Sequence, residues 1–77
     1  MARRTDPDAF VRRVARRIAE VRRQRGLTQE QLAERVGTSV RALQRTEAGA
    51  QNLTLRSVAR LALALGVKPE ELIVASE

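Results

Sequence analysis

The sequence predicts an all-α domain built from five short helices, and three observations carry this prediction. Apolar residues recur at intervals of three and four, as they do along one face of a helix. Asp, Thr and Ser, which are good N-caps, precede these segments, and glycine follows most of them. No segment shows the alternation of apolar and polar residues that is typical of a half-buried strand.

The length and composition narrow the function further. A chain of 77 residues is one small domain, which buries only about 60% of its unfolded surface. It contains no Cys and no His, which excludes disulfides, zinc fingers and imidazole chemistry. No apolar run is long enough to be a signal peptide or a membrane span, so we expect a cytoplasmic protein that does not bind membranes.

The charge points to a nucleic acid as the partner. The formal net charge is +6, with 15 Lys and Arg residues, and clustered cations gain affinity for a polyanion by releasing its counterions. One Phe and no Tyr or Trp leave almost nothing on which unpaired bases could stack. We therefore expect double-stranded DNA rather than a single strand.

The first helix is expected from Pro7 to about Arg25, with Asp6 as its N-cap. Residues 1–5 precede it as a flexible basic arm, and residues 6–77 form the single domain. The arginine Arg22 lies at the edge of the apolar stripe, so we expect it to be partly buried and to need a partner. The stripe that faces the core consists of Phe10, Val11, Val14, Ile18 and Val21.

Two shorter helices are expected over Gln29–Val36 and Val40–Ala48. Thr28 and Gln31 have the spacing of a capping box at the start of the first one. Glycines allow left-handed caps at the ends of both, and the hydroxyls of the turn between them can cap the second. These residues are Gly37 and Gly49 for the ends, and Thr38 and Ser39 for the turn.

Two further helices complete the prediction. Thr54 is expected to cap a helix over Leu55–Leu65, and Pro69 to begin a last helix that runs to about Ala75. In the longer of the two, the helical spacing predicts burial of Leu55, Val58, Leu61, Ala62 and Leu65.

The stretch from Thr28 to Gly49 resembles the helix-turn-helix of the phage-repressor and Cro family, often called the XRE family. Residues that match the family pattern are Gln29, Leu32, Ala33, Gly37, Ser39, Leu43, Glu47 and Gly49. The resemblance extends over about residues 18–73 and is greatest to the small controller proteins of restriction-modification systems. It implies a compact five-helix lambda-repressor-like DNA-binding domain, in which the second and third helices form the helix-turn-helix.

The resemblance also implies which residues contact DNA. In this family the third helix enters the major groove, while the second helix and the flanking loops contact phosphates. Base contacts are expected from Val40, Arg41, Gln44 and Arg45, where Arg suits guanine, Gln suits adenine and Val suits the thymine methyl. Phosphate contacts are expected from Gln29, Thr38, Ser39, Asn52, Thr54 and Arg56.

Two structural expectations follow from the same resemblance. The family pairs its counterpart of Arg22 with the Glu of a Glu-x-Gly motif, which here is Glu47. The family also usually has a large apolar residue where this chain has Thr46. We therefore expect a structural ion pair between Arg22 and Glu47, and an inner side of the third helix that is underpacked or filled by a neighbour.

Three consecutive apolar residues near the end of the chain suggest a homodimer. Leu72, Ile73 and Val74 cannot all face one core, so at least one is expected to be exposed at a dimer interface. Two recognition helices related by a two-fold axis meet half-sites about 34 Å apart. A dimer would therefore bind an inverted repeat.

The leading hypothesis is a transcriptional regulator that binds a specific duplex sequence and either represses or activates. An antitoxin that represses its own promoter and binds a toxin, and a protein-binding adaptor of the same fold, are alternatives. A membrane-surface module is disfavoured because the apolar stripe of the first helix is needed for the core. We expect no enzyme, cofactor, metal or small-molecule effector, since no catalytic constellation or Gly-rich phosphate loop is present.

Overall fold

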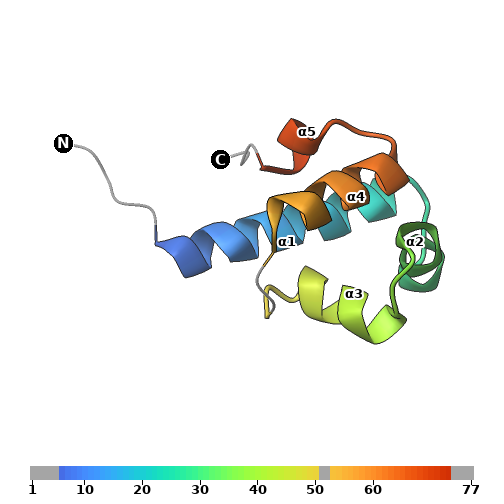
Figure 1. The fold of residues 1–77 in the computed structure, drawn as a ribbon, viewed down its shortest axis with the longest axis horizontal. Coiled ribbons are helices and arrows are strands. Elements are labelled where there is room, and N and C mark those ends of the chain that lie inside the picture. The colour runs from blue at the N-terminus through green and yellow to red at the C-terminus, as the bar shows by residue number, and fades with distance from the viewer. Residues whose placement is uncertain (1–5, 51–52, 74–77) are drawn as a thin grey trace.

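The computed structural model describes residues 6–50 and 53–73, and this part of the chain folds into five helices without a strand (Figure 1). The all-α prediction is confirmed. The expected arm at residues 1–5, Asn52 and Val74 lie outside the described residues. The helices are α1 (Pro7–Gln24), α2 (Gln29–Val36), α3 (Val40–Glu47), α4 (Leu55–Leu65) and α5 (Pro69–Ile73).

The predicted caps define the helix ends. Thr28 and Gln31 form a reciprocal capping box, in which the Gln31 backbone N–H donates to Thr28 Oγ1 at 3.0 Å and the Thr28 N–H donates to Gln31 Oε1 at 2.9 Å. The side chains of Asp6, Ser39 and Thr54 cap α1, α3 and α4 in the same general way. Helices α1 and α3 each end one residue earlier than expected, at Gln24 and Glu47.

The core lies where α1 and α4 cross, with α2 and α3 on one side and α5 on the other (Figure 1). Large side chains from every helix meet there and are almost completely buried, which places a single apolar cluster at the centre of the domain. Its largest members are Ile18, Leu32, Leu43 and Leu72.

The structure corrects two predictions of burial. Leu55 was expected in the core but is 80% exposed, because α4 begins there and its first turn has no helix packed over it on that side. Phe10 is 37% exposed, because the N-terminal turns of α1 extend beyond the other helices (Figure 1). Its ring instead lies 5.7 Å from the guanidinium carbon of Arg13, a cation–π distance.

Of the three residues expected at a dimer interface, the structure excludes Leu72. Leu72 is 1% exposed and belongs to the core of its own chain, so it has no surface to offer a second copy. Helix α5 buries this residue by packing against α1 and α4. Of the three residues, Ile73 is half-buried at the edge of the core and Val74 lies outside the described residues.

Candidate nucleic-acid interface

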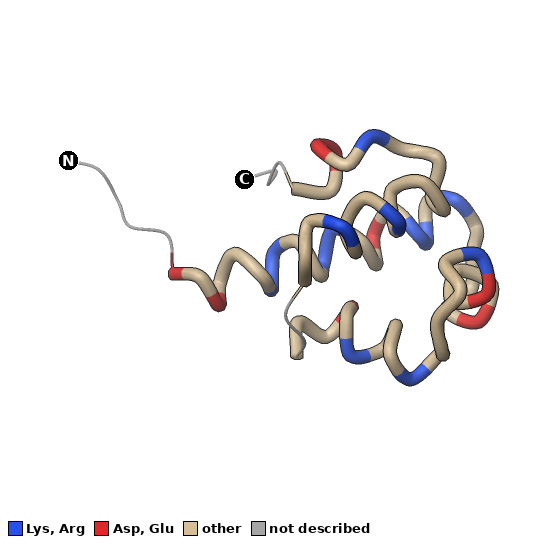
Figure 2. Tube along the Cα trace, in the orientation of Figure 1, with Lys and Arg blue, Asp and Glu red and all other residues tan. Residues whose placement is uncertain are grey.

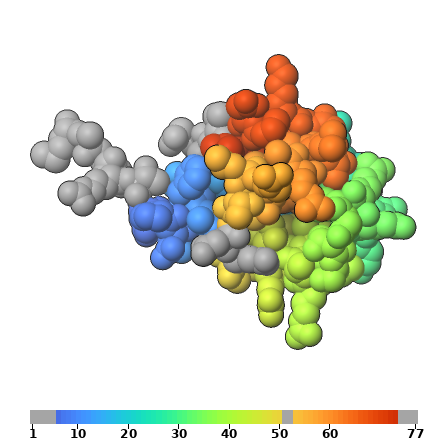
Figure 3. Space-filling model, in the orientation of Figure 1, coloured from blue at the N-terminus to red at the C-terminus, as the bar shows by residue number. Residues whose placement is uncertain are grey.

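Helix α3 has one polar, open face. Arg41, Gln44 and Arg45 are all exposed, and their spacing of three and four residues places them on the same side of the helix. In Figure 3, side chains of α3 project beyond the rest of the surface at the lower edge of the molecule. Val40 differs, because it is half-buried and packs against the core. Three of the four expected base-contact residues are therefore exposed.

The opposite side of α3 attaches it to the domain. Leu43 is 1% exposed and joins the core, and the Ser39 hydroxyl accepts the Ala42 backbone N–H at 3.0 Å to cap the helix. An eight-residue helix has little stability alone, so its position depends on these attachments. They direct the face of Arg41, Gln44 and Arg45 outward.

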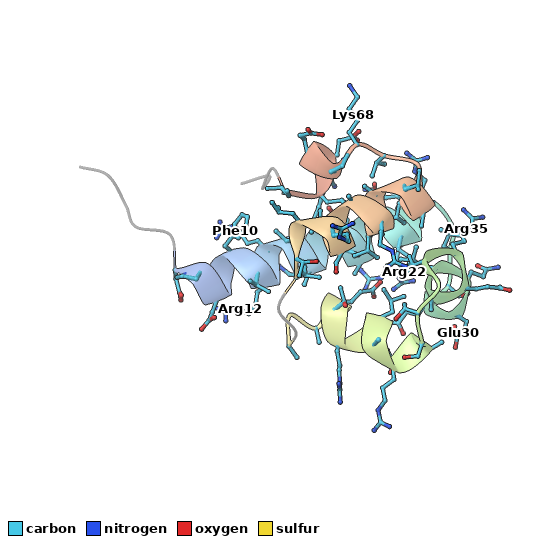
Figure 4. The ribbon with its side chains drawn as sticks, in the orientation of Figure 1. Phe10, Arg12, Arg22, Glu30, Arg35 and Lys68 are labelled. Atoms are coloured by element: carbon cyan, nitrogen blue, oxygen red, sulfur yellow. The ribbon has the colours of Figure 1, made fainter. Side chains whose placement is uncertain are left out.

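A buried ion pair fixes the C-terminal end of α3. Arg22 Nε donates to Glu47 Oε2 at 2.7 Å, and Arg22 Nη2 donates to Glu47 Oε1 at 3.1 Å. The two side chains are only 10% and 6% exposed. The remaining nitrogen, Nη1, donates to the Leu27 carbonyl oxygen at 2.8 Å, so the guanidinium joins α1, the α1–α2 connection and α3 (Figure 4). The pair expected from the family resemblance is therefore present.

Gln29 extends this network to the surface of α3. Its Nε2 donates to Glu47 Oε1 at 3.0 Å, and its Oε1 accepts from Gln44 Nε2 at 3.4 Å. Both ends of the Gln29 amide are therefore engaged within the protein, which the sequence analysis did not foresee. Gln29 remains the first residue of α2, where a backbone N–H has no partner within the helix and favours an anion.

The other expected phosphate contacts differ in how free they are. Thr38 and Arg56 are exposed. Ser39 and Thr54 already use their hydroxyls as helix caps, and Thr54 Oγ1 also lies 2.9 Å from Ser57 Oγ. Their side chains are thus oriented toward their own helices, although each stands beside the unpaired N–H groups of a helix start.

The charges complete the description of this face. Figure 2 shows basic positions on the outer side of α3 and along α4. Glu47 is the one acid of α3, and it is buried and paired with Arg22. The exposed face of α3 therefore carries the positive charge of Arg41 and Arg45 without an acid of its own helix, which suits a polyanion.

A cavity of about 170 Å³ lies behind α3, between the α2–α3 turn and α4. Thr46 lines it, together with Thr38, Ser57 and Arg60, and Arg60 Nη2 donates to the Val36 carbonyl oxygen at 3.3 Å. Thr46 therefore borders open space at the position where the family usually has a large apolar residue, which agrees with the expected underpacking of the inner side of α3.

Within residues 6–50 and 53–73, no group of three or more His, Cys, Asp or Glu residues is placed to hold a metal ion. In the same part of the chain, no helix is long and apolar enough to cross a membrane.

Comparisons with known proteins agree with this geometry. The helix-turn-helix family HTH_3 matches residues 18–72. The chain is 39% identical to an uncharacterized HTH-type transcriptional regulator, y4dJ, from Sinorhizobium fredii. The aligned 64 residues make up 83% of each protein.

Two solved structures of similar proteins extend the comparison. The restriction-modification controller protein C.AhdI from Aeromonas hydrophila superimposes with a TM-score of 0.79 at 34% identity, over 83% of this chain and 97% of that one. A hypothetical transcription factor, NHTF, from Neisseria gives a TM-score of 0.81 at 28% identity, over 97% of this chain and 86% of that one.

Proposed function

This chain belongs to the XRE-type helix-turn-helix family of DNA-binding transcription regulators, and from that premise we propose that it binds one specific duplex sequence as a homodimer. The observation that carries the proposal is the face of α3. Two arginines and a glutamine are exposed together there, on a helix that the core and a buried ion pair hold from behind. This is the arrangement that major-groove recognition requires.

The chemistry of these side chains suggests their roles. Arg41 and Arg45 each present a planar fork of donors that fits N7 and O6 of guanine, and Gln44 can pair with N6 and N7 of adenine. Val40, which packs against the core, retains only part of its surface for a thymine methyl. Phosphate contacts are proposed from the helix start at Gln29 and from the exposed and capping residues Thr38, Ser39, Thr54 and Arg56.

The two-fold symmetry is supported by apolar surface that the monomer leaves open. Leu55 and Leu63 are 80% and 84% exposed, and Ala59 lies between them on the same side of α4. We call these three residues the α4 stripe. Large apolar side chains in water are unfavourable, and a symmetric contact with a second copy would cover them.

The similarity to C.AhdI, at 34% identity over most of both chains, supports a role as a restriction-modification controller protein. A gene for a methyltransferase or restriction endonuclease beside this one would agree with that role. A toxin gene in that place would favour an autorepressing antitoxin instead.

Selection from a random duplex library at physiological salt tests the DNA-binding proposal, because non-specific binding through charge is weakened there. The parent protein should enrich an inverted repeat, and Arg41→Ala and Arg45→Ala should each relax one symmetric pair of positions. Arg35→Ala is the matched control, since Arg35 is also an exposed helical arginine and points away from α3 in Figure 4. Binding that only fades uniformly with salt, without a motif, would contradict the proposal.

Sedimentation over a range of protein concentrations tests the dimer separately. A Leu55→Glu/Leu63→Glu double variant should remain folded but shift the equilibrium toward the monomer, because four carboxylates would face each other across the two-fold axis. Gln24→Glu, at an exposed position near the end of α1, should leave the equilibrium unchanged. An unaltered dimer in the double variant would exclude the α4 stripe as the interface.

A further inference from the structure

Hydrogen bonds join Arg22, Glu47, Gln29 and Gln44 in a network. The donor and the acceptor of the contact between Gln29 and Glu47 cannot be exchanged. An ionised carboxylate only accepts hydrogen bonds, so Gln29 must present its NH₂ group to Glu47. The distance from Gln29 Nε2 to Glu47 Oε1 is 3.0 Å. Turning this amide over would set its oxygen against a carboxylate oxygen that is buried with a side-chain exposure of 6%. The orientation of the Gln29 amide is therefore determined by the ion pair.

The orientation of the Gln29 amide also determines that of Gln44. With its nitrogen toward Glu47, Gln29 turns its Oε1 to Gln44, whose Nε2 lies 3.4 Å away. Gln44 thus points its NH₂ group toward Gln29. Its own carbonyl oxygen and the second amide hydrogen are left for the exposed side of α3. A buried charge and an exposed amide are coupled through a single intervening side chain.

From this coupling we infer that Gln29 is a specificity-determining positioning residue, which holds Gln44 so that it accepts adenine and rejects guanine at one base pair. The inference rests on the proposed function and deepens it. Adenine offers the N6 amino group to the Gln44 oxygen and N7 to its remaining amide hydrogen. Guanine presents two acceptors, O6 and N7, and the Gln44 oxygen would face one of them.

The rejection of guanine needs the whole chain of contacts. To donate to guanine with both amide hydrogens, Gln44 must turn over, which sets its oxygen against the Gln29 oxygen. Gln29 cannot turn in response, because Glu47 accepts only. Discrimination of this kind comes from an unfavourable contact with the wrong base as much as from a favourable one with the right base.

The test replaces Gln29 by a side chain of similar length without a polar amide. A Gln44→Met variant first identifies, on the operator selected by the parent, the base pair that Gln44 contacts. Affinities are then measured for that operator and for its A·T to G·C replacement at that pair. The parent should prefer adenine by about tenfold, and Gln29→Met should reduce the preference to about twofold, mainly by binding guanine more tightly.

Two further variants sharpen the result. Gln29→Met/Gln44→Met should behave as Gln44→Met alone, because the effect of Gln29 passes through Gln44. Gln24→Met, which changes an exposed glutamine of α1, should retain the parent preference. Thermal melting of each variant verifies that it is folded.

Other results would overturn the inference. If Gln29→Met weakens binding to all duplexes equally and leaves the ratio between them unchanged, then its side chain contacts a phosphate instead. If the adenine preference persists in Gln29→Met, then Gln44 needs no positioning.

Failure of the proposed function gives a different pattern. A parent protein without any preference among duplexes removes the specificity role, and the positioning is then measured in the free protein by NMR. The side-chain amide protons of Gln44 should differ from those of the exposed Gln24 and should move to the Gln24 values in Gln29→Met. Identical Gln44 signals in parent and variant would show that Gln29 does not position it.

Discussion

Helix α3 is held tightly on one inner flank, at Glu47, and loosely on the other, at Thr46, although these residues are neighbours in the sequence. On the side of α1 and α2, Glu47 accepts three hydrogen bonds from Arg22 and Gln29. Within the described residues, no buried side-chain N or O atom lacks a partner. On the side of α4, Thr46 faces a cavity of about 170 Å³. Residue 47 is fully engaged and residue 46 is loosely packed.

From this difference we expect the position of α3 to depend more on the flank of Glu47 than on the flank of Thr46. Glu47 contacts Gln29, which contacts Gln44, so a shift of Glu47 would move the side chain that we propose to contact adenine. The cavity lies on the other side, against α4, where a void costs stability but leaves the exposed face in place. Three predictions test this comparison.

The largest effect is expected from Glu47→Ala, which leaves Arg22 buried without its charge partner. We expect the free energy of unfolding to fall by about 3 kcal/mol, as when one member of a buried pair is removed. The melting temperature should fall by about 10 °C or more for a domain of this size. Glu34→Ala is the control, because Glu34 is an exposed acid on α2 and should matter by less than about 0.5 kcal/mol. A melting temperature within a degree of the parent would contradict the structural role of the pair.

An intermediate effect is expected from Gly49→Ala, which tests how closely α3 approaches α1. Gly49 has a φ of +73°, and an added Cβ would lie 3.3 Å from the Arg12 backbone Cα. Gly26 has a nearly equal φ of +70° with nothing within 4 Å, so Gly26→Ala measures the backbone strain alone. That strain should be about 1 kcal/mol. Gly49→Ala should destabilise by about 1 kcal/mol more than its control, because packed backbone cannot yield freely. Equal losses in chemical denaturation would mean that α1 and α3 separate without cost.

The smallest effect, of opposite sign, is expected from Thr46→Ile. The added methylene enters existing space and should raise the free energy of unfolding by about 0.8 kcal/mol. Thr46→Val, which replaces the hydroxyl without adding volume, separates the loss of polarity from the filling of the cavity. The sequence preference of Thr46→Ile for DNA should equal that of the parent. A changed preference would show that packing between Thr46 and α4 also positions the exposed face of α3.

The sequence by itself determined the helices and their order. N-caps at Asp6, Thr28, Ser39 and Thr54 were predicted and are used, since a cap joins a side chain to a backbone N–H only two or three residues away. The exposed face of α3 was also predictable, because helical spacing alone groups Arg41, Gln44 and Arg45. Helical spacing indicated only that Arg22 is partly buried and needs a partner. The resemblance to a family identified that partner as Glu47.

Tertiary packing alone decided which surfaces are covered and which amides are engaged. Helical spacing placed Leu55 with the core of α4, but no other helix covers that turn, and the side chain is exposed. The sequence indicated only that at least one of Leu72, Ile73 and Val74 is exposed, and the packing of α5 against α1 and α4 buries Leu72. The contact of Gln29 with Glu47 spans 18 positions of the sequence. Local patterns specify helices because capping and periodicity act within a turn or two, whereas burial and side-chain partners depend on elements that only the folded chain brings together.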